Sequence, residues 1–170
     1  MSFKINTILK KRYYMSKSIL EGKKILAVDD EPDIVKVLEE EVKEAAPNCF
    51  FDKALTYEEA LEKMEKNTYD IVILDIMGVR GFDLLEYGTK RGFRVVMLTA
   101  HALNAEALEK SYKMKAHGYL PKDKLGEIVP FLEDILQHDF FTGWKRLLEK
   151  LETFFDKNID PDWRNRIKFY

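Results

Sequence analysis

The sequence contains a single cysteine, Cys49, so no disulfide bond can form within the chain. Structural disulfides belong to oxidising compartments, and a chain without them suits a reducing, cytoplasmic location. Cys49 precedes the apolar pair Phe50 and Phe51, so we expect it to be a small buried hydrophobic residue. No apolar run approaches the roughly 18–20 residues of a membrane span, so no transmembrane segment is expected.

The sequence also lacks a strong excess of charge of either sign. The net charge is -2, which argues against direct binding of nucleic acid. Residues 1–24 hold seven Lys or Arg and one acidic residue, so a basic leader precedes an acidic core. The leader has no apolar segment behind its basic residues and is not expected to be a secretory signal. We treat residues 1–22 as a basic N-terminal extension.

Between residues 23 and 137, five short apolar runs alternate with segments of helical periodicity. The runs that predict strands are Lys23–Val28, Cys49–Ala54, Asp70–Met77, Arg94–Leu98 and His117–Leu120. Alternation of strands and helices predicts an α/β fold, in which a doubly wound parallel sheet is joined by right-handed crossovers. The length of 170 residues suits one domain with a full core.

Two of the predicted helices contain residues that disfavour helix. Gly88 follows the helical segment Phe82–Tyr87, so this helix is expected to be short. Pro130 lies within the segment Leu125–Leu136, which predicts either a kink or a late helix start.

Polar or charged residues stand at or near the carboxyl ends of four of the five apolar runs, namely Asp29 and Asp30, Asp75, Thr99, and Lys122. Loops after parallel strands converge at one edge of an open sheet, so these side chains are expected to meet. Three carboxylates in one pocket repel one another, and a hard divalent cation such as Mg²⁺ relieves that repulsion. A carboxylate nucleophile with Mg²⁺, a lysine and a hydroxyl has the parts for phosphoryl transfer.

Four motifs, in order, resemble those of the response-regulator receiver domain family. They are VDDEPD at Val28–Asp33, ILDIM at Ile73–Met77, MLTAHA at Met97–Ala102 and GYLPK at Gly118–Lys122. The resemblance covers residues 23–137 and implies a flavodoxin-like fold with five parallel strands in the order 2-1-3-4-5. It also implies a response regulator of a two-component phosphorelay, which is a phosphoacceptor signalling protein rather than an enzyme.

The resemblance implies that Asp75 accepts a phosphoryl group from the phosphohistidine of a histidine kinase or phosphotransfer protein. It implies that Asp29 and Asp30 hold Mg²⁺ together with Asp75 and the backbone carbonyl of Met77. Lys122 would pair with the phosphoryl oxygens, and the chain would assist its own phosphorylation and dephosphorylation.

The resemblance further implies a switch, in which Thr99 moves to bond the phosphoryl group and Tyr119 rotates inward with it. Tyr119 has a second interpretation, as a half-buried strand aromatic without a switching role. Two loops depart from the family: Asp123 stands after Lys122 where a proline is usual, and Gly78–Gly81 replaces the usual proline-containing turn.

Three other functions are weighed against this one. A haloacid-dehalogenase-like phosphatase also uses a strand-end aspartate but needs a second aspartate two residues on, where this chain has Met77. A flavodoxin needs a phosphate loop after the first strand, where Asp29 and Asp30 would repel phosphate. A pseudo-receiver that binds partners without phosphorylation is the remaining alternative.

Residues 138–170 form a C-terminal tail with an amphipathic, aromatic-rich helical stripe that starts at Thr142 or Gly143. The stripe is expected to pack back on the receiver, and self-association as a homodimer is the next interpretation. A membrane-surface helix is disfavoured by the acidic residues that dilute its basic face. Contacts with an unknown downstream protein are expected on the face formed by the fourth helix, the fifth strand and the fifth helix.

Overall fold

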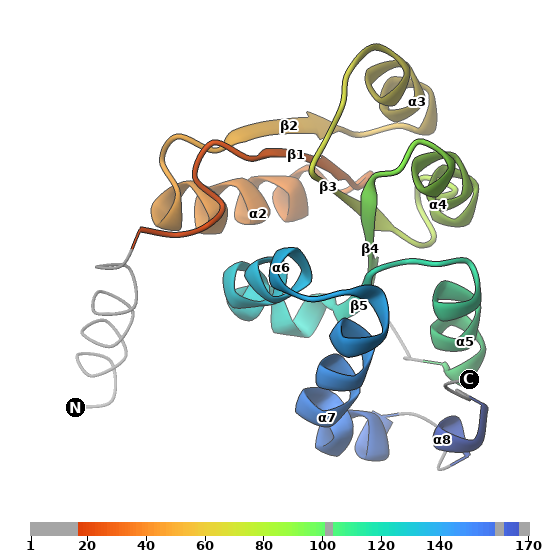
Figure 1. Cartoon of the computed structure of the whole chain (residues 1–170). Coiled ribbons are helices and arrows are strands. Elements are labelled where there is room, and N and C mark those ends of the chain that lie inside the picture. The colour runs from red at the N-terminus through yellow and green to blue at the C-terminus, as the bar shows by residue number, and fades with distance from the viewer. Residues whose placement is uncertain (1–16, 101–103, 159–161, 167–170) are drawn as a thin grey trace.

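The computed structural model describes residues 17–100, 104–158 and 162–166 and places a five-stranded sheet at the centre of the chain (Figure 1). The strands are β1 Lys24–Val28, β2 Phe50–Ala54, β3 Ile71–Asp75, β4 Arg94–Thr99 and β5 Gly118–Pro121. Their order is β2-β1-β3-β4-β5, and every neighbouring pair is parallel. The predicted doubly wound, flavodoxin-like sheet is confirmed. Most of the N-terminal extension and part of the third motif, including His101, lie outside these ranges.

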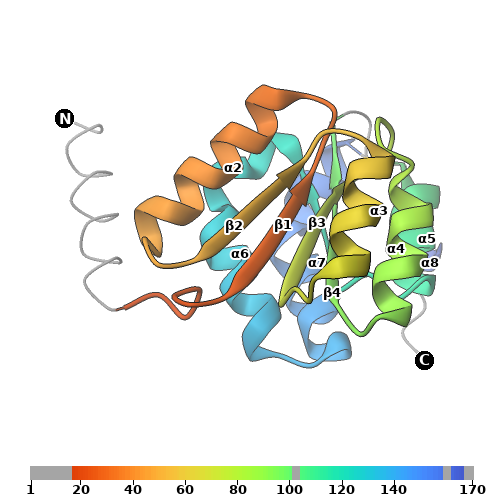
Figure 2. The same ribbon diagram turned by 90° about the horizontal axis from the view of Figure 1, so that it is seen from above.

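Helices cover both faces of the sheet, as Figure 2 shows. They are α2 Pro32–Ala45, α3 Tyr57–Lys66, α4 Gly81–Lys90, α5 Ala105–Lys113 and α6 Ile128–Gln137. Along each strand, alternate apolar side chains belong to two separate clusters, one shared with α2 and α6 and the other with α3, α4 and α5. Because every central strand is buried on both faces, its sequence is an unbroken apolar run.

Helix α4 is longer than the sequence predicts. It runs from Gly81 to Lys90, through Gly88, which is buried. A Cβ atom at Gly88 would lie 2.9 Å from Val95 and 3.0 Å from Met64. The glycine therefore lets the helix approach the sheet closely, and this packing outweighs its low helix propensity. The prediction of a shortened helix was wrong.

The late-start interpretation of Pro130 is confirmed. A 3₁₀ helix, η1, covers Lys122–Glu127, and α6 begins directly after it at Ile128. Pro130 thus lies in the first turn of α6, where a proline removes no hydrogen bond from the helix.

The tail forms a long helix, α7 Phe140–Asn158, followed by the short α8 Trp163–Arg166. Helix α7 begins before the predicted Thr142, because the Asp139 carboxylate accepts a hydrogen bond from the Thr142 N–H at 2.9 Å. In the described part of the chain, no helix combines the length and the apolarity needed to cross a membrane.

Helix α7 packs on the receiver beside β5, at the edge of the sheet (Figure 1). Trp144 is fully buried and donates a hydrogen bond from its indole N–H to the Ala116 carbonyl at 2.8 Å. Its ring meets that of Tyr112 edge to face, with centroids 5.3 Å apart. The prediction that the tail packs back on the receiver is confirmed. This helix covers the α5–β5–α6 face that was assigned to partner contacts.

Candidate functional site

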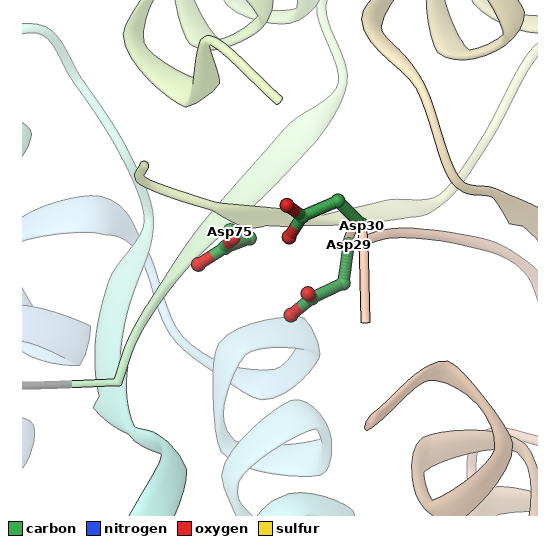
Figure 3. Close-up of side chains that lie close together, drawn as sticks. All are labelled: Asp29, Asp30 and Asp75. Atoms are coloured by element: carbon green, nitrogen blue, oxygen red, sulfur yellow. The ribbon is translucent and has the colours of Figure 1, made fainter. Parts of the chain in front are cut away.

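Three carboxylates meet at the carboxyl edge of the sheet, where β1 and β3 end side by side. Asp29 and Asp30 follow β1, and Asp75 is the last residue of β3. Figure 3 shows the three side chains directed toward a common region, and each offers an oxygen within 4.8 Å of the others. Asp29 and Asp75 are buried, whereas Asp30 is exposed to solvent. The sequence-based prediction that these acids come together is confirmed.

Lys122 supplies the opposite charge from the start of η1, directly after β5. Its Nζ lies 2.7 Å from Asp29 Oδ2 and 3.3 Å from Asp75 Oδ1. A third carboxylate, Glu31, approaches it at 3.0 Å. Burial lowers the pKa of Lys122, but its bonds to Asp29 and Glu31 outweigh burial and hold that pKa above its ordinary value. The ammonium group is therefore charged at any physiological pH.

Asp29 is an ionisable residue in a buried position, where carrying a charge costs free energy. Burial raises the pKa of its carboxyl above the ordinary value, and Lys122 and the Glu31 N–H only partly offset this. Its Oδ1 accepts that N–H at 3.0 Å, and its Oδ2 lies 2.7 Å from Lys122 Nζ. Each carboxylate oxygen can accept more than one interaction, so Oδ2 can pair with Lys122 and also serve as a ligand to a metal ion.

The donor set fits Mg²⁺. This ion takes oxygen ligands at about 2.1 Å, which places neighbouring ligands about 3–4 Å apart and requires only a small closure of the three acids. Asp29, Asp30 and Asp75 supply hard anionic oxygens, and Asp30 faces solvent, from which water ligands would come. Met77 is 86% exposed, and the role of its backbone carbonyl as a metal ligand stays a prediction.

The turn after β3 packs closely against Asp30 and Asp75. This close packing was not predicted from the sequence. The Gly78 N–H donates to Asp75 Oδ2 at 3.1 Å. A Cβ atom at Gly78 would lie 2.1 Å from Asp30 Oδ1, and one at Gly81 would lie 2.2 Å from the Asp75 carbonyl oxygen. Both glycines are therefore required by the site. Gly78 and Gly81 were noted in the sequence, where they indicated only a turn.

Thr99 ends β4 in a half-buried position, one residue beyond Leu98, which pairs in register with Asp75. Tyr119, on β5, is fully buried, so the half-buried interpretation of this residue was wrong. Burial raises the pKa of Tyr119 to about 12, and Thr99 is the polar group that opposes this rise. Among the described residues, which leave out 101–103, the Tyr119 hydroxyl has no hydrogen-bond partner of normal geometry. The switching roles of both residues stay predictions.

Comparisons with known proteins agree with this geometry. The family model of the response regulator receiver domain matches residues 25–132. The two-component response regulator ARR18 of Arabidopsis thaliana is 37% identical over 87 residues, which are 48% of this chain and 13% of ARR18. The response regulator protein TrrA from Thermotoga maritima, solved in complex with Mg²⁺ and BeF, is 36% identical. The match has a TM-score of 0.53 and covers 65% of this chain and 98% of the TrrA chain.

The response regulator DrrB of Thermotoga maritima shares the fold at 23% identity, with a TM-score of 0.59 over 68% of this chain and 52% of DrrB. The chain thus spans a small part of ARR18 and about half of DrrB. The matched segment ends before α7, so the tail lies outside the family model. Since that model matches more than half of the sequence, the chain belongs to the response regulator receiver domain family.

Proposed function

We propose that this chain is a phosphoacceptor of a two-component phosphorelay and that Asp75 receives the phosphoryl group from a histidine kinase or phosphotransfer protein. The observation that carries the proposal is the position of Lys122 Nζ, which lies 2.7 Å from Asp29 and 3.3 Å from Asp75. Lys122 is a cation that lies between two buried carboxylates. Its positive charge is complementary to the negative charge that an incoming phosphoryl group would bring to this edge of the sheet.

In the proposed reaction, an Asp75 carboxylate oxygen attacks the phosphorus of a phosphohistidine. An O–P bond forms, the P–N bond breaks and the imidazole leaves with the electron pair. The Lys122 ammonium group would pair with the phosphoryl oxygens. The Gly78 N–H, which donates a hydrogen bond to Asp75 Oδ2, would hold the Asp75 carboxylate in position. Asp29, Asp30 and Asp75 would hold Mg²⁺, which when bound supplies positive charge to the phosphoryl oxygens.

We propose that phosphorylation is read out by protein contacts that involve α7. In this chain α7 covers the α5–β5–α6 face, and Tyr119 belongs to the same apolar cluster as Trp144 and Phe155 of α7. A structural change at Thr99 and Tyr119 would therefore alter the packing of α7 first, and a partner protein would sense the change through this helix. The buried, unpaired Cys49 is compatible with the reducing, cytoplasmic setting that we propose.

Intact mass measurement after incubation with Mg²⁺ and acetyl phosphate tests the proposal. We expect one phosphoryl adduct that is lost in Asp75→Asn and kept in Asp123→Asn, a matched change at an exposed aspartate beside Lys122. Circular dichroism establishes that both variants are folded. Absence of the adduct from the folded parent protein would favour the pseudo-receiver, which binds partners without phosphorylation.

A further inference from the structure

A pocket of about 550 Å³ lies between α6 and α7, apart from the Asp75 site. Its lining residues come from His117 and β5, η1, α6 and α7, and they include neither the three acids nor Lys122. The floor is apolar and consists of Leu120, Phe131, Ile135, Leu147, Leu151 and Phe154. The volume falls within the range of roughly 300–1,000 Å³ that is typical of small-molecule sites in proteins.

The rim of this pocket carries an excess of positive charge. Lys124, Lys150 and Lys157 line it, together with two acids, Glu127 and Asp134. Within the described residues, neither Lys124 nor Lys157 has a carboxylate within 4.0 Å, although Lys124 Nζ lies 5.4 Å from the Phe154 ring. As far as the described residues go, Lys124 and Lys157 are therefore open to an anion.

The acid at the α6–α7 junction is already neutralised. The Arg146 Nε lies 3.0 Å from both carboxylate oxygens of Asp134, and Lys150 approaches it at 3.8 Å. Although burial raises the pKa of Asp134, Arg146 and Lys150 outweigh it and hold that pKa below its ordinary value. Asp134 is thus ionised and paired, so it adds little repulsion toward a bound anion.

His117 forms one wall of the pocket and is uncharged at neutral pH. Its burial, aided by the charge of Arg94, lowers its pKa to about 4. Apart from Glu127 and the paired Asp134, the charge on the pocket therefore lies on the lysines of its rim, while the interior is apolar. This distribution suits a molecule with one anionic group and an apolar body.

We propose that the α6–α7 pocket binds an apolar monoanion, of which a medium-chain carboxylate is the simplest example. The apolar body lies on the floor between the two helices, and the anionic group meets Lys124 and Lys157. This site does not depend on phosphorylation of Asp75, so its test and that of the proposed function can fail separately.

The probe is 1-anilinonaphthalene-8-sulfonate, an aromatic monoanion, titrated into the full chain and followed by fluorescence. We expect one saturable site, from which decanoate displaces the probe and decyltrimethylammonium does not. The double variant Lys124→Glu/Lys157→Glu should bind the probe about tenfold more weakly, because two attractions become repulsions. Lys145→Glu is the matched control, since Lys145 is exposed on the same helix and lines a different surface patch.

A steric variant tests the position of the site. Gly143 lines the pocket, and a Cβ atom there would meet nothing within 4 Å, so Gly143→Leu should fill space without straining α7. We expect this variant to keep its fold and to lose the probe. The proposal is overturned if both variants bind like the parent protein, or if Lys145→Glu is the change that weakens binding. The latter would place the probe on the exposed Phe141 patch.

Discussion

Gly78 stands against the Asp30 carboxylate, and we predict that Gly78→Ala weakens Mg²⁺ binding while leaving the fold intact. A Cβ atom at this position would lie 2.1 Å from Asp30 Oδ1 and 2.3 Å from its Cγ. Ordinary contact begins at about 3.4 Å, so the carboxylate must move by more than an ångström. Such a movement takes one of the three acidic groups away from the other two.

The size of the effect follows from the surroundings of Asp30. Its side chain is exposed, so it rotates into solvent at little cost, and the free energy of unfolding should change by less than about 1 kcal/mol. Gly78 does not have a positive φ, so alanine fits its backbone and keeps the N–H bond to Asp75. Misplacing a supporting group of a metal site costs about 10–100-fold in affinity, and we expect a loss of this order.

Isothermal titration calorimetry with Mg²⁺ measures the affinity, and urea unfolding measures the stability. Gly126→Ala is the control, because a Cβ atom at Gly126 meets nothing within 4 Å. Unchanged Mg²⁺ affinity in folded Gly78→Ala would refute the reasoning, since it would mean that Asp30 need not keep its position. A collapse of stability would refute it as well, because the alanine would then have disturbed more than Asp30.

Three further predictions concern stability, each measured by urea unfolding. Trp144→Ala should cost about 3–5 kcal/mol, because it removes a fully buried ring and the bond to Ala116, and a loss below 1 kcal/mol would contradict the packing of α7. Lys122→Met should cost about 3 kcal/mol without Mg²⁺, since buried Asp29 loses its counter-charge, and a variant as stable as the parent would count against that pairing. Because the folded pKa of Asp134 is depressed, its contribution is present above the unfolded pKa of about 3.9 and lost as the pH falls through the folded value. Asp134→Asn should remove this dependence, and a pH profile identical to that of the parent would exclude the contribution.

The central strands were predictable because they are buried on both faces and their sequences are therefore apolar runs, whereas the order 2-1-3-4-5 was an implication of the family resemblance. The length of α4 was not predictable. Gly88 disfavours helix in isolation, and only its contacts with Met64 and Val95 show why the helix continues through it. Those contacts join residues that are distant in the sequence, so local propensity has no access to them.

The candidate site likewise contains residues that could be predicted from the sequence and one that could not. Asp29, Asp30, Asp75 and Lys122 were predictable because strand ends converge at one edge of a parallel sheet. Glu31 was missed because its role depends on Lys122, which lies ninety-one positions later in the chain. Its signal was present, since it directly follows the two predicted metal ligands, but the sequence alone assigned it no partner.

Tyr119 shares an apolar cluster with Trp144 and Phe155 of α7, so the readout that we propose involves this helix. Five apolar side chains of α7 are buried, namely Trp144, Leu147, Leu148, Leu151 and Phe155. At about 1.5–3 kcal/mol for each, releasing them all would cost roughly 7–15 kcal/mol, which is comparable with the whole stability of a domain. Coupling between two sites in a protein is typically about 1–3 kcal/mol, so phosphorylation of Asp75 would not release α7 completely. In the readout that we propose, a partner would therefore recognise α7 in place, or a small shift of it, and the exposed Phe141 is an apolar residue of this helix that is open to such a contact.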